Sequence, residues 1–307
     1  MTNHLLHQPG ASDTVQPCSA SAWPASVLVV GCGLIGTSLA LALAGIRQTA
    51  SFIGIEPNPE YRTLLPSEVF LHTYADLSAV PESTHVDLAI LAAPLGVACE
   101  LLEATARMAD IVMDVCSAKT LICEKATVTG LQSQFVPTHP MAGMAAAGPL
   151  HASAELFSGQ PWLFLEGWPA NEKITELVTE VGAAVTVLST ADEHDTAMAA
   201  VSHAIHLTSL AAMLAFDEAA GASAWRGITG PAFRDITRLA ASPSGFWVDV
   251  LTANAEAVRS QVLSIADKLH DFNELLVYGD RNALKERLDA AREARTRWQE
   301  VQDKQSR

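Results

Sequence analysis

The chain has 307 residues, 49% of them apolar, and its length predicts two domains with a sizeable core in each. A formal net charge of −15 argues against binding to nucleic acids or anionic membranes, because both need basic surfaces. The five cysteines show no Cys-x-x-Cys spacing, so we expect reduced thiols in a cytoplasmic protein, with neither disulfides nor a zinc site.

The chain begins with a segment that resembles neither a secretory signal nor a folded element. Residues 1–25 are rich in Ser, Gln, Pro and Ala, and we expect a flexible tail. Residues 26–45 carry no charge and are long enough to span a membrane, but they contain four glycines and divide into a β-branched run and an Ala/Leu run. A buried strand, a tight turn and a buried helix account better for this pattern.

Up to residue 189, short β-forming runs alternate with helical stretches. The runs cover residues 27–30, 52–56, 86–91, 111–115, 135–138, 162–165 and 185–188. Such alternation predicts a mostly parallel sheet with helices on both faces, so we expect a Rossmann-type α/β domain over residues 26–189.

From residue 190 onwards the sequence predicts helices only, over residues 192–218, 246–276 and 281–302. The first of them is apolar on nearly every side, which suits a helix inside a bundle or between subunits. We expect residues 190–307 to form an all-α domain that joins two copies of the chain into a homodimer.

A glycine-rich turn follows the first strand and opens a helix. It reads Gly31-Cys32-Gly33-Leu34-Ile35-Gly36. The first glycine permits a tight turn, the second lets the backbone approach a pyrophosphate, and the third allows close packing of helix on strand. The pattern predicts a dinucleotide site.

Glu56 ends the next strand, where its carboxylate would bind the adenosine ribose and repel a 2′-phosphate, so NAD is favoured over NADP. Arg62 is near in sequence and could pair with such a phosphate, which keeps NADP open. Ala93 and Pro94 end a further strand, where they would either admit the nicotinamide ribose or form a simple strand-to-helix turn.

His139 is the leading catalytic candidate. It stands at a strand end in Thr138-His139-Pro140-Met141-Ala142-Gly143, and its imidazole could take the proton that is released as a hydride departs. The plain alternative is a histidine in a Pro/Gly turn. Ser117 follows another strand and could act beside His139 or cap a helix.

The helical half carries further polar groups. His203 and His206 are three residues apart, but no third ligand has suitable spacing, so we expect no metal. Histidines in an apolar helix more often bond to the backbone. Arg234 and Arg238 are four residues apart on an expected helix and could pair with nearby carboxylates.

Together these motifs resemble the prephenate/arogenate (cyclohexadienyl) dehydrogenase family. Between residues 27 and 276 the chain carries, in the order of that family, Gly-x-Gly-x-x-Gly, Asp-x-x-Ser-x-Lys, His-Pro-Met-Ala-Gly-x(4)-Gly, Ser-His-x-x-His and Arg-Asp-x-Thr-Arg-x-Ala-x-Ser-x(4)-Trp. The resemblance implies NAD-dependent oxidative decarboxylation of prephenate to 4-hydroxyphenylpyruvate, CO2 and NADH, a step of tyrosine biosynthesis.

The resemblance also implies roles for single residues. His139 would accept the proton of the C4 hydroxyl, and Ser117 would hydrogen-bond across substrate and cofactor. Arg238 resembles the arginine that anchors a substrate carboxylate. His206 resembles a substrate-side histidine, with His203 near it, and Trp247 resembles a pocket wall. Because these residues come from both halves, we expect the site in the cleft between the domains.

Two departures from the family bear on the substrate. After Gly143 the chain reads Met144-Ala145-Ala146-Ala147, so no carboxylate is present there to bind the amine of arogenate. Ile205 replaces the proline usual between the paired histidines. With Met144 in the pocket, prephenate is favoured, while arogenate and 4-amino-4-deoxyprephenate, a substrate of secondary metabolism, stay open.

Two other classes share part of the pattern. The β-hydroxyacid dehydrogenases also join a Rossmann domain to helices, but they carry a catalytic lysine in the long helix, and residues 192–218 contain none. A non-catalytic NAD-binding sensor would have no reason to keep Ser117, His139, His206 and Arg238 together.

Overall fold

The computed structural model describes residues 23–143, 147–169 and 171–305, so most of the expected N-terminal tail lies outside it. The first part of the chain forms a six-stranded parallel sheet in the order β3-β2-β1-β4-β5-β6. The strands are β1 (Ser26–Val30), β2 (Ser51–Ile55), β3 (Phe70–Tyr74), β4 (Val86–Leu91), β5 (Ala109–Asp114) and β6 (Phe135–Val136). This strand order is that of a dinucleotide-binding α/β fold, which confirms the predicted class.

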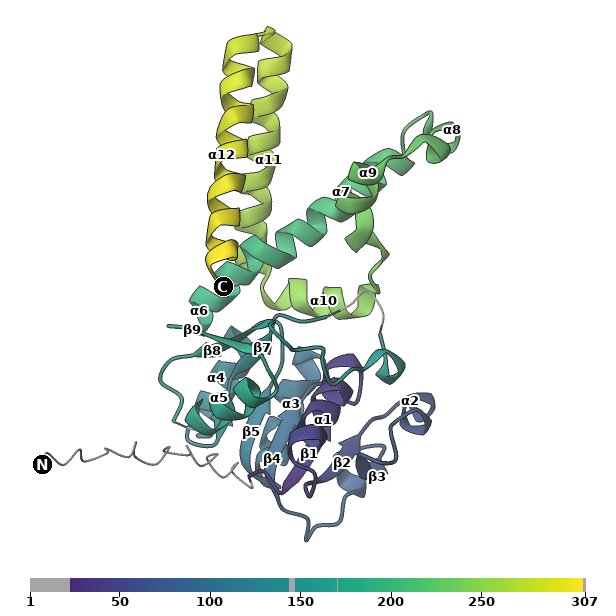
Figure 1. Cartoon of the computed structure of the whole chain (residues 1–307), viewed down its shortest axis with the longest axis vertical. Helices are drawn as coiled ribbons and strands as arrows, with labels where there is room; N and C mark the ends of the chain where they lie inside the picture. Colours follow the sequence, from purple (N-terminus) through teal and green to yellow (C-terminus); the bar gives the residue numbers. More distant parts are fainter. Residues whose placement is uncertain (1–22, 144–146, 170, 306–307) are drawn as a thin grey trace, which may run out of the picture.

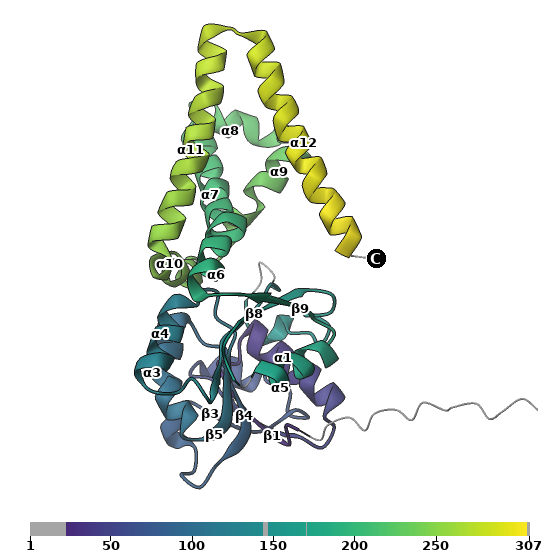
Figure 2. The same ribbon diagram turned by 90° about the vertical axis from the view of Figure 1, so that its left-hand side faces the viewer.

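Helices cover both faces of the sheet, as Figure 2 shows. On one side lie α1 (Leu34–Ile46) and α5 (Asn171–Glu180), and on the other α3 (Leu95–Ala106) and α4 (Thr120–Val128). Successive side chains of β1 alternate between the two layers: Val27 and Val29 join the core under α1, while Leu28 and Val30 join the core under α3. Because both faces are buried, the strand is apolar throughout. The charge-free stretch 26–45 is therefore a strand, a turn and a helix, as predicted.

A second, three-stranded sheet was not expected. It consists of β7 (Thr138–Pro140), β8 (Pro161–Leu165) and β9 (Ala184–Leu188), with β7 antiparallel and β9 parallel to β8. The predicted run 135–138 thus divides at Pro137 between the two sheets, since proline has no N–H to continue a ladder. In β7, His139 stands opposite Leu163.

The strand β3 was also missing from the predicted elements. Only Phe70 among its five residues is buried, so the strand lacks the apolar run by which the others were recognised. It lies at the edge of the sheet, next to β2 and near the short helix α2 (Pro59–Thr63).

The remainder of the chain is helical. The predicted long helix exists as α6 (Ala191–Met198), a π-helical turn η3 (Ala199–His203) and α7 (Ala204–Asp217) in direct succession. The predicted helix 246–276 is wrong as a single element, because Asn254 separates α10 (Ser244–Ala253) from α11 (Ala255–Tyr278). The other helical elements are α8 (Ala222–Trp225), η4 (Arg226–Ile228), α9 (Pro231–Thr237), η5 (Arg238–Ala241) and α12 (Arg281–Gln305).

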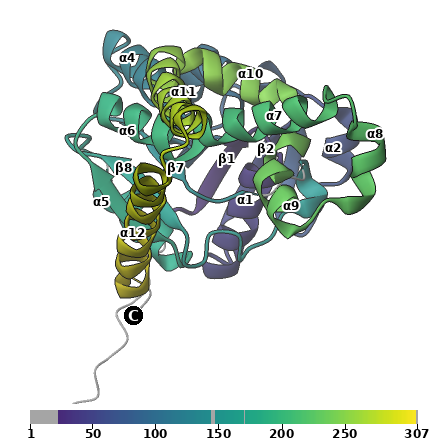
Figure 3. The same ribbon diagram turned by 90° about the horizontal axis from the view of Figure 1, so that it is seen from above.

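These helices extend well away from the sheets (Figure 1). Helix α7 runs out to α8 and α9, and the chain returns through α10, which lies with α6 over the sheets when viewed from above (Figure 3). Helices α11 and α12 project as a hairpin whose arms diverge in Figure 2. Apolar side chains on them are exposed, among them Leu269 at 63% and Leu276 at 67%.

The helix Ala191–Asp217 is long and apolar enough to cross a membrane by length and composition, and it alone passes that test in the part of the chain described. A single helix of this kind is weak support for a membrane span, since the core and interface helices of globular proteins pass the same test.

Candidate active site

Each glycine of the turn between β1 and α1 meets a different constraint. Gly31 has φ +94°, and a Cβ on it would lie 2.6 Å from the carbonyl oxygen of Ala92. A Cβ on Gly36 would lie 2.1 Å from the carbonyl oxygen of Gly31. A Cβ on Gly33 would meet nothing within 4 Å, so Gly33 faces open space. The turn is therefore tightly packed against the end of β4 and α1 at Gly31 and Gly36 and open at Gly33.

That open side lies at the N-terminus of α1, whose first turn includes Leu34 and Ile35. Backbone N–H groups there have no acceptor within the helix and attract an anion. The residues present thus fit a pyrophosphate. Ala93 and Pro94 lie beside the turn, between β4 and α3, and Pro94 occupies the N-cap position of α3.

Glu56 is buried at the end of β2, next to the glycine-rich turn. Its two carboxylate oxygens accept hydrogen bonds from the backbone N–H groups of Cys32 (3.1 Å) and Asn58 (2.9 Å). Each oxygen keeps lone pairs for a ribose hydroxyl. Arg62 donates to the backbone carbonyls of Glu56 (2.6 Å) and Pro57 (2.9 Å), so its guanidinium is held at the same place.

Cys32 was expected beside the cofactor, but its side chain points into the core. The thiol is fully buried, and Sγ lies 3.7 Å from the carbonyl oxygens of Val29 and Ile55. Burial raises the pKa of this thiol far above its usual range. Only the backbone of Cys32 can face a nucleotide.

His139 lies in a strand rather than in a turn, and a second imidazole contacts it. Its Nδ1 is 3.0 Å from Nε2 of His194 in α6, and Nδ1 of His194 is 2.8 Å from Oδ1 of Asp195. Burial lowers the pKa of His139 well below its usual value, and the neighbouring His194 adds to this shift. His139 is therefore a neutral, buried base at the junction of the second sheet with α6.

Asp195 also fixes the loop that carries Ser117. Its carboxylate accepts hydrogen bonds from the backbone N–H groups of Lys119 (2.7 Å) and Thr120 (2.9 Å), at the start of α4. The N-cap position of α4 is Lys119, so Ser117 does not cap this helix. Ser117 lies half-buried in the loop between β5 and α4.

A buried ion pair also holds the loop that carries Ser117. The ammonium of Lys119 pairs with the carboxylate of Asp114 at the end of β5, and both side chains are inaccessible to solvent. Asp114 also accepts hydrogen bonds from the backbone N–H groups of Cys116 (3.0 Å) and Thr138 (3.1 Å). The loop of Ser117 and the strand of His139 are thereby tied to one carboxylate.

Two further histidines occupy the inner end of the helical region. Asn254 donates through Nδ2 to the carbonyl oxygen of Asp195 (2.6 Å) and lies 3.2 Å from Nδ1 of His203. Burial lowers the pKa of His203 to about 4, so it is neutral. His206 stacks on Trp247, with ring centroids 3.6 Å apart and planes 10° from parallel. The structure thus brings the rings of His203, His206 and Trp247 together.

Arg238 takes no part in these contacts. The expected helix through Arg234 and Arg238 ends at Thr237, and Arg238 begins η5 with its side chain exposed. Within the described ranges it makes no hydrogen bond or ion pair, so nothing links it to the histidines or to Asp235. Met144, predicted to line the pocket, lies outside the described residues.

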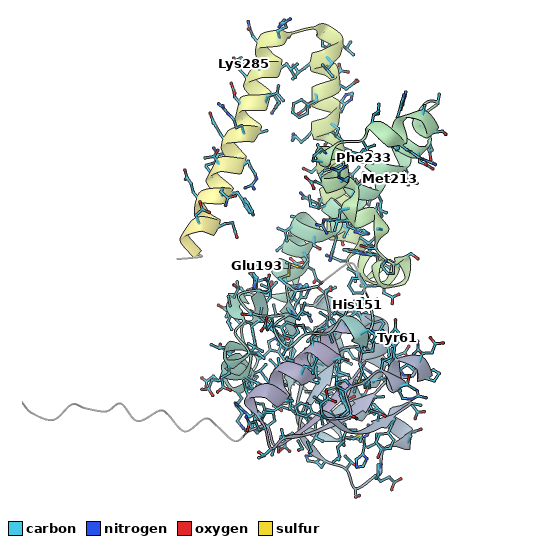
Figure 4. All side chains as sticks on the ribbon, turned by 45° about the vertical axis from the view of Figure 1, so that its right-hand side comes forward. Tyr61, His151, Glu193, Met213, Phe233 and Lys285 are labelled. Carbon is cyan, nitrogen blue, oxygen red and sulfur yellow. The ribbon has the colours of Figure 1, made fainter. Side chains whose placement is uncertain are left out.

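Beyond residues 144–146 the chain contacts the nucleotide-binding domain at two points. Gly148 has φ +89°, and a Cβ on it would lie 3.0 Å from the ring of Tyr61 in α2. The backbone N–H of Ser153 donates to Oγ of Ser38 in α1 (3.0 Å). Figure 4 shows Tyr61 and His151 at the edge of the nucleotide-binding domain that faces the helical region, with Glu193 at the junction. Further out, Met213 and Phe233 mark the helical arm, and Lys285 lies near the tip of the hairpin (Figure 4).

The sequence interpretation gave no role to His194, Asp195 or Asn254. The adjacent His194-Asp195 pair at the start of a long helix was the available signal. It lacked weight because the partner, His139, is 55 residues earlier in the chain.

A dinucleotide-binding sheet, a helical region and a neutral buried histidine where they meet define a nucleotide-dependent dehydrogenase. Two family profiles match the chain: prephenate dehydrogenase, nucleotide-binding domain, over residues 39–187, and prephenate dehydrogenase, dimerization domain, over residues 190–290. The chain belongs to the prephenate dehydrogenase family, which confirms the resemblance and decides against the β-hydroxyacid dehydrogenases.

Individual relatives agree with this assignment. The prephenate dehydrogenase of Lactococcus lactis subsp. cremoris is 28% identical over 88% of this chain and 76% of its own length. NovF of Streptomyces niveus, named a probable prephenate dehydrogenase, is 30% identical over 82% of this chain and 68% of its own. The structure of prephenate dehydrogenase from A. aeolicus, in complex with hydroxyphenyl propionate and NAD+, has a TM-score of 0.80 at 23% identity, covering 89% of this chain and 97% of that one. It confirms the fold.

Proposed function

We propose that this chain catalyses the NAD-dependent oxidative decarboxylation of prephenate to 4-hydroxyphenylpyruvate, with release of CO2 and NADH. The observation that carries the proposal is His139, a neutral buried imidazole at the junction of the nucleotide-binding domain and the helical region. Membership of the prephenate dehydrogenase family supports it, and so does the name of the Lactococcus relative.

The reaction requires a base at one oxygen atom. NAD held by the glycine-rich turn and Glu56 would supply the acceptor for the hydride at C4, and loss of the ring carboxylate as CO2 gives the aromatic product. His139 accepts the proton of the C4 hydroxyl. Ser117, half-buried on the neighbouring loop, orients that hydroxyl by a hydrogen bond.

The substrate carries two carboxylates, and a protein of net charge −15 can hold them only with local cations. Arg238 supplies one, because its guanidinium is exposed and has no carboxylate partner in the described part of the chain. His206 contacts the substrate from the helical region, with Trp247 as a wall and His203 next to it. Met144, which lies outside the described residues, belongs to the same proposed pocket.

The glycine-rich turn and Glu56 bind NAD. Gly33, Leu34 and Ile35 present backbone N–H groups to the pyrophosphate. Glu56 receives the adenosine ribose, and its negative charge disfavours the 2′-phosphate of NADP. Ala93 and Pro94 border the nicotinamide ribose.

We further propose that the two domains divide between residues 189 and 190 and that two copies pair through the helical domain in the cytoplasm. The profile boundaries at residues 187 and 190 support the division, and the name of the second profile supports the pairing. The exposed apolar side chains of α11 add to this support.

The test is NADH formation with prephenate, arogenate and 4-amino-4-deoxyprephenate, compared by kcat/KM on the same protein. We expect prephenate to be preferred, with one CO2 released per NADH. A higher kcat/KM with arogenate or with 4-amino-4-deoxyprephenate would change the proposed substrate but not the proposed type of reaction. The absence of NADH with all three would overturn the proposal and favour a non-catalytic sensor.

A further inference from the structure

The paired side chains of His194 and Asp195 contact neither the proposed substrate nor the nucleotide, yet they lie directly behind His139. We propose that they are positioning residues, which hold His139 in the tautomer with its hydrogen on Nδ1 and leave Nε2 as the proton acceptor. This inference rests on the proposed function, because it assigns the atom at which His139 acts.

The carboxylate of Asp195 is ionised. Asp195 is surrounded by donors: the backbone N–H groups of Lys119 and Thr120 and Nδ1 of His194. The hydrogen bonds from His194 and Thr120 lower the pKa of Asp195 to about 2, despite its burial, so the group is ionised at neutral pH. The N-terminus of α4, nine residues long, also favours a negative charge there.

An ionised carboxylate accepts hydrogen bonds and cannot donate them. Nδ1 of His194, 2.8 Å from Oδ1 of Asp195, must therefore carry a hydrogen. Burial lowers the pKa of His194, so the imidazole is neutral and has only one N–H. Its Nε2 is then an acceptor.

The accepting Nε2 of His194 in turn fixes the tautomer of His139. Nδ1 of His139 lies 3.0 Å from the accepting Nε2 of His194, so Nδ1 of His139 is the donor. His139 is neutral as well, which leaves a lone pair on its Nε2. Nε2 of His139 has no hydrogen-bond partner among the described residues. It is also not among the solvent-inaccessible atoms without a partner, which include Nδ1 of His206. It is open to an incoming ligand.

The other charged groups near His139 do not disturb this order. Lys119 is neutralised by Asp114 in the buried pair, and His203 is neutral. Burial lowers the pKa of Lys119, but the carboxylate of Asp114 and the nearby thiols of Cys116 and Cys123 together raise it above its usual value. The remaining anion is Asp195, one imidazole away.

The arrangement suits the proton transfer. As the O–H bond of the substrate breaks, a new N–H bond forms at Nε2 of His139, and the O–H electron pair forms the C=O bond while the hydride leaves C4 for the nicotinamide. His139 then carries a positive charge. It keeps its Nδ1–H bond to His194, whose own N–H is held by Asp195, so the carboxylate stabilises the charge through the intervening ring.

Nitrogen-15 NMR of the histidine-labelled protein reads the tautomer directly. We expect the resonances of His139, assigned by their loss in His139→Gln, to show hydrogen on Nδ1 and an unprotonated Nε2 at neutral pH. Hydrogen on Nε2 would overturn the proposal. This measurement needs no substrate, so it stands even if prephenate is not turned over.

Two substitutions of His194 separate positioning from packing. His194→Leu removes the acceptor for Nδ1 of His139, and kcat with prephenate is expected to fall by roughly 10²–10⁴-fold, the usual effect of losing a general base. His194→Gln offers an amide oxygen as acceptor and is expected to restore much of the rate and the Nδ1–H tautomer. Equal kcat in His194→Leu and wild type would overturn the proposal and leave the proposed function intact.

A matched control exists on the surface. His85 forms the same kind of pair with Asp110, Nε2 to Oδ1 at 2.8 Å, but both side chains are more than half exposed. His85→Leu is expected to leave kcat and the His139 resonances unchanged. If His194→Leu does not fold, as judged by circular dichroism, the glutamine variant and the wild-type spectrum still decide the matter.

Discussion

His139 differs from an ordinary surface histidine in its protonation state and in its exposure to solvent. It is only 7% exposed, and burial disfavours its protonated form. A base that is neutral at physiological pH is ready to accept a proton, and one that is held by a neighbouring ring loses little entropy in doing so. The proposed reaction therefore depends on both ring nitrogens of His139: Nδ1 contacts His194, and Nε2 accepts the proton.

Replacement of His139 by asparagine removes the accepting Nε2 and keeps a small polar side chain. We expect kcat with prephenate to fall by roughly two to four orders of magnitude, with the Kd for NAD unchanged, because His139 does not touch the nucleotide turn. Steady-state kinetics and NAD titration measure the two quantities. Turnover at the wild-type rate would remove His139 from the mechanism.

The pH profile follows from the direction of the pKa shifts. Burial lowers the pKa of both His139 and His194 below 6.5, so the neutral base persists on acidification. The kcat/KM for prephenate should stay level through pH 6.5 and fall only below it, at a value that belongs to the coupled pair. An acidic limb centred at or above pH 6.5 would show that His139 is not the base, or not buried, in the working enzyme.

Glu56 sets the preference between nucleotides. Glu56→Gln removes the charge that repels a 2′-phosphate, and we expect NAD binding to weaken by about 1.5–3 kcal/mol while binding of NADP improves. Arg62 is already held beside this carboxylate and should contribute to the gain. The double variant Glu56→Gln/Arg62→Gln is the control, in which the gain in NADP binding should vanish. No change in the NAD to NADP ratio would place the ribose elsewhere.

At the scale of elements, one glycine of the turn between β1 and α1 is needed for packing, and another for access of the nucleotide. A methyl group at position 36 would meet a backbone oxygen at 2.1 Å, whereas a methyl group at position 33 has open space and an ordinary φ of −76°. Two glycines of one motif thus serve different ends.

Alanine substitutions should reveal this difference. Gly36→Ala is expected to lower the free energy of unfolding by about 1–3 kcal/mol or more, as overpacking does. Gly33→Ala should leave stability within about 0.5 kcal/mol of wild type but weaken NAD binding, because the methyl group occupies the pyrophosphate's place. Urea unfolding and NAD titration measure both effects. A stable Gly36→Ala variant with normal NAD binding would contradict this account.

The elements could be predicted where the signal was local. The β1–turn–α1 unit, the strands β4, β5 and β8 and the helix α7 are each mostly apolar. Edge strand β3 has only one buried residue, and the break at Asn254 depends on hydrogen bonds to Asp195 and His203, 59 and 51 residues away. The contact of His139 with His194 likewise needs the fold before it can be recognised.

For the whole molecule, the exposed apolar surface of the helical hairpin indicates pairing of two chains. Leu269 and Leu276 are seven residues apart and share one side of α11. Exposed leucines at this spacing are typical of a helix that packs against another helix.

Glutamates at these two positions should favour the monomer. We expect the Leu269→Glu/Leu276→Glu variant to shift the mass in light scattering from two chains towards one, because charges would be buried in the interface. Val128→Glu is the control: Val128 is 85% exposed but lies on α4 of the nucleotide-binding domain. A dimer as tight as the wild type in the double variant would place the interface on other helices.

The π-helical turn η3 sets the rotational phase of everything that follows it. A wider turn accommodates an added residue, and each residue corresponds to about 100° of rotation around an α-helix. If Ala199–His203 were wound as a regular α-helix of the same length, α7 would be turned relative to α6 and His206 would leave the face of Trp247, while Asp195, which precedes the turn, would stay in register with α4. The position of one widened turn thus coordinates two groups of side chains that no contact within the helix itself could align.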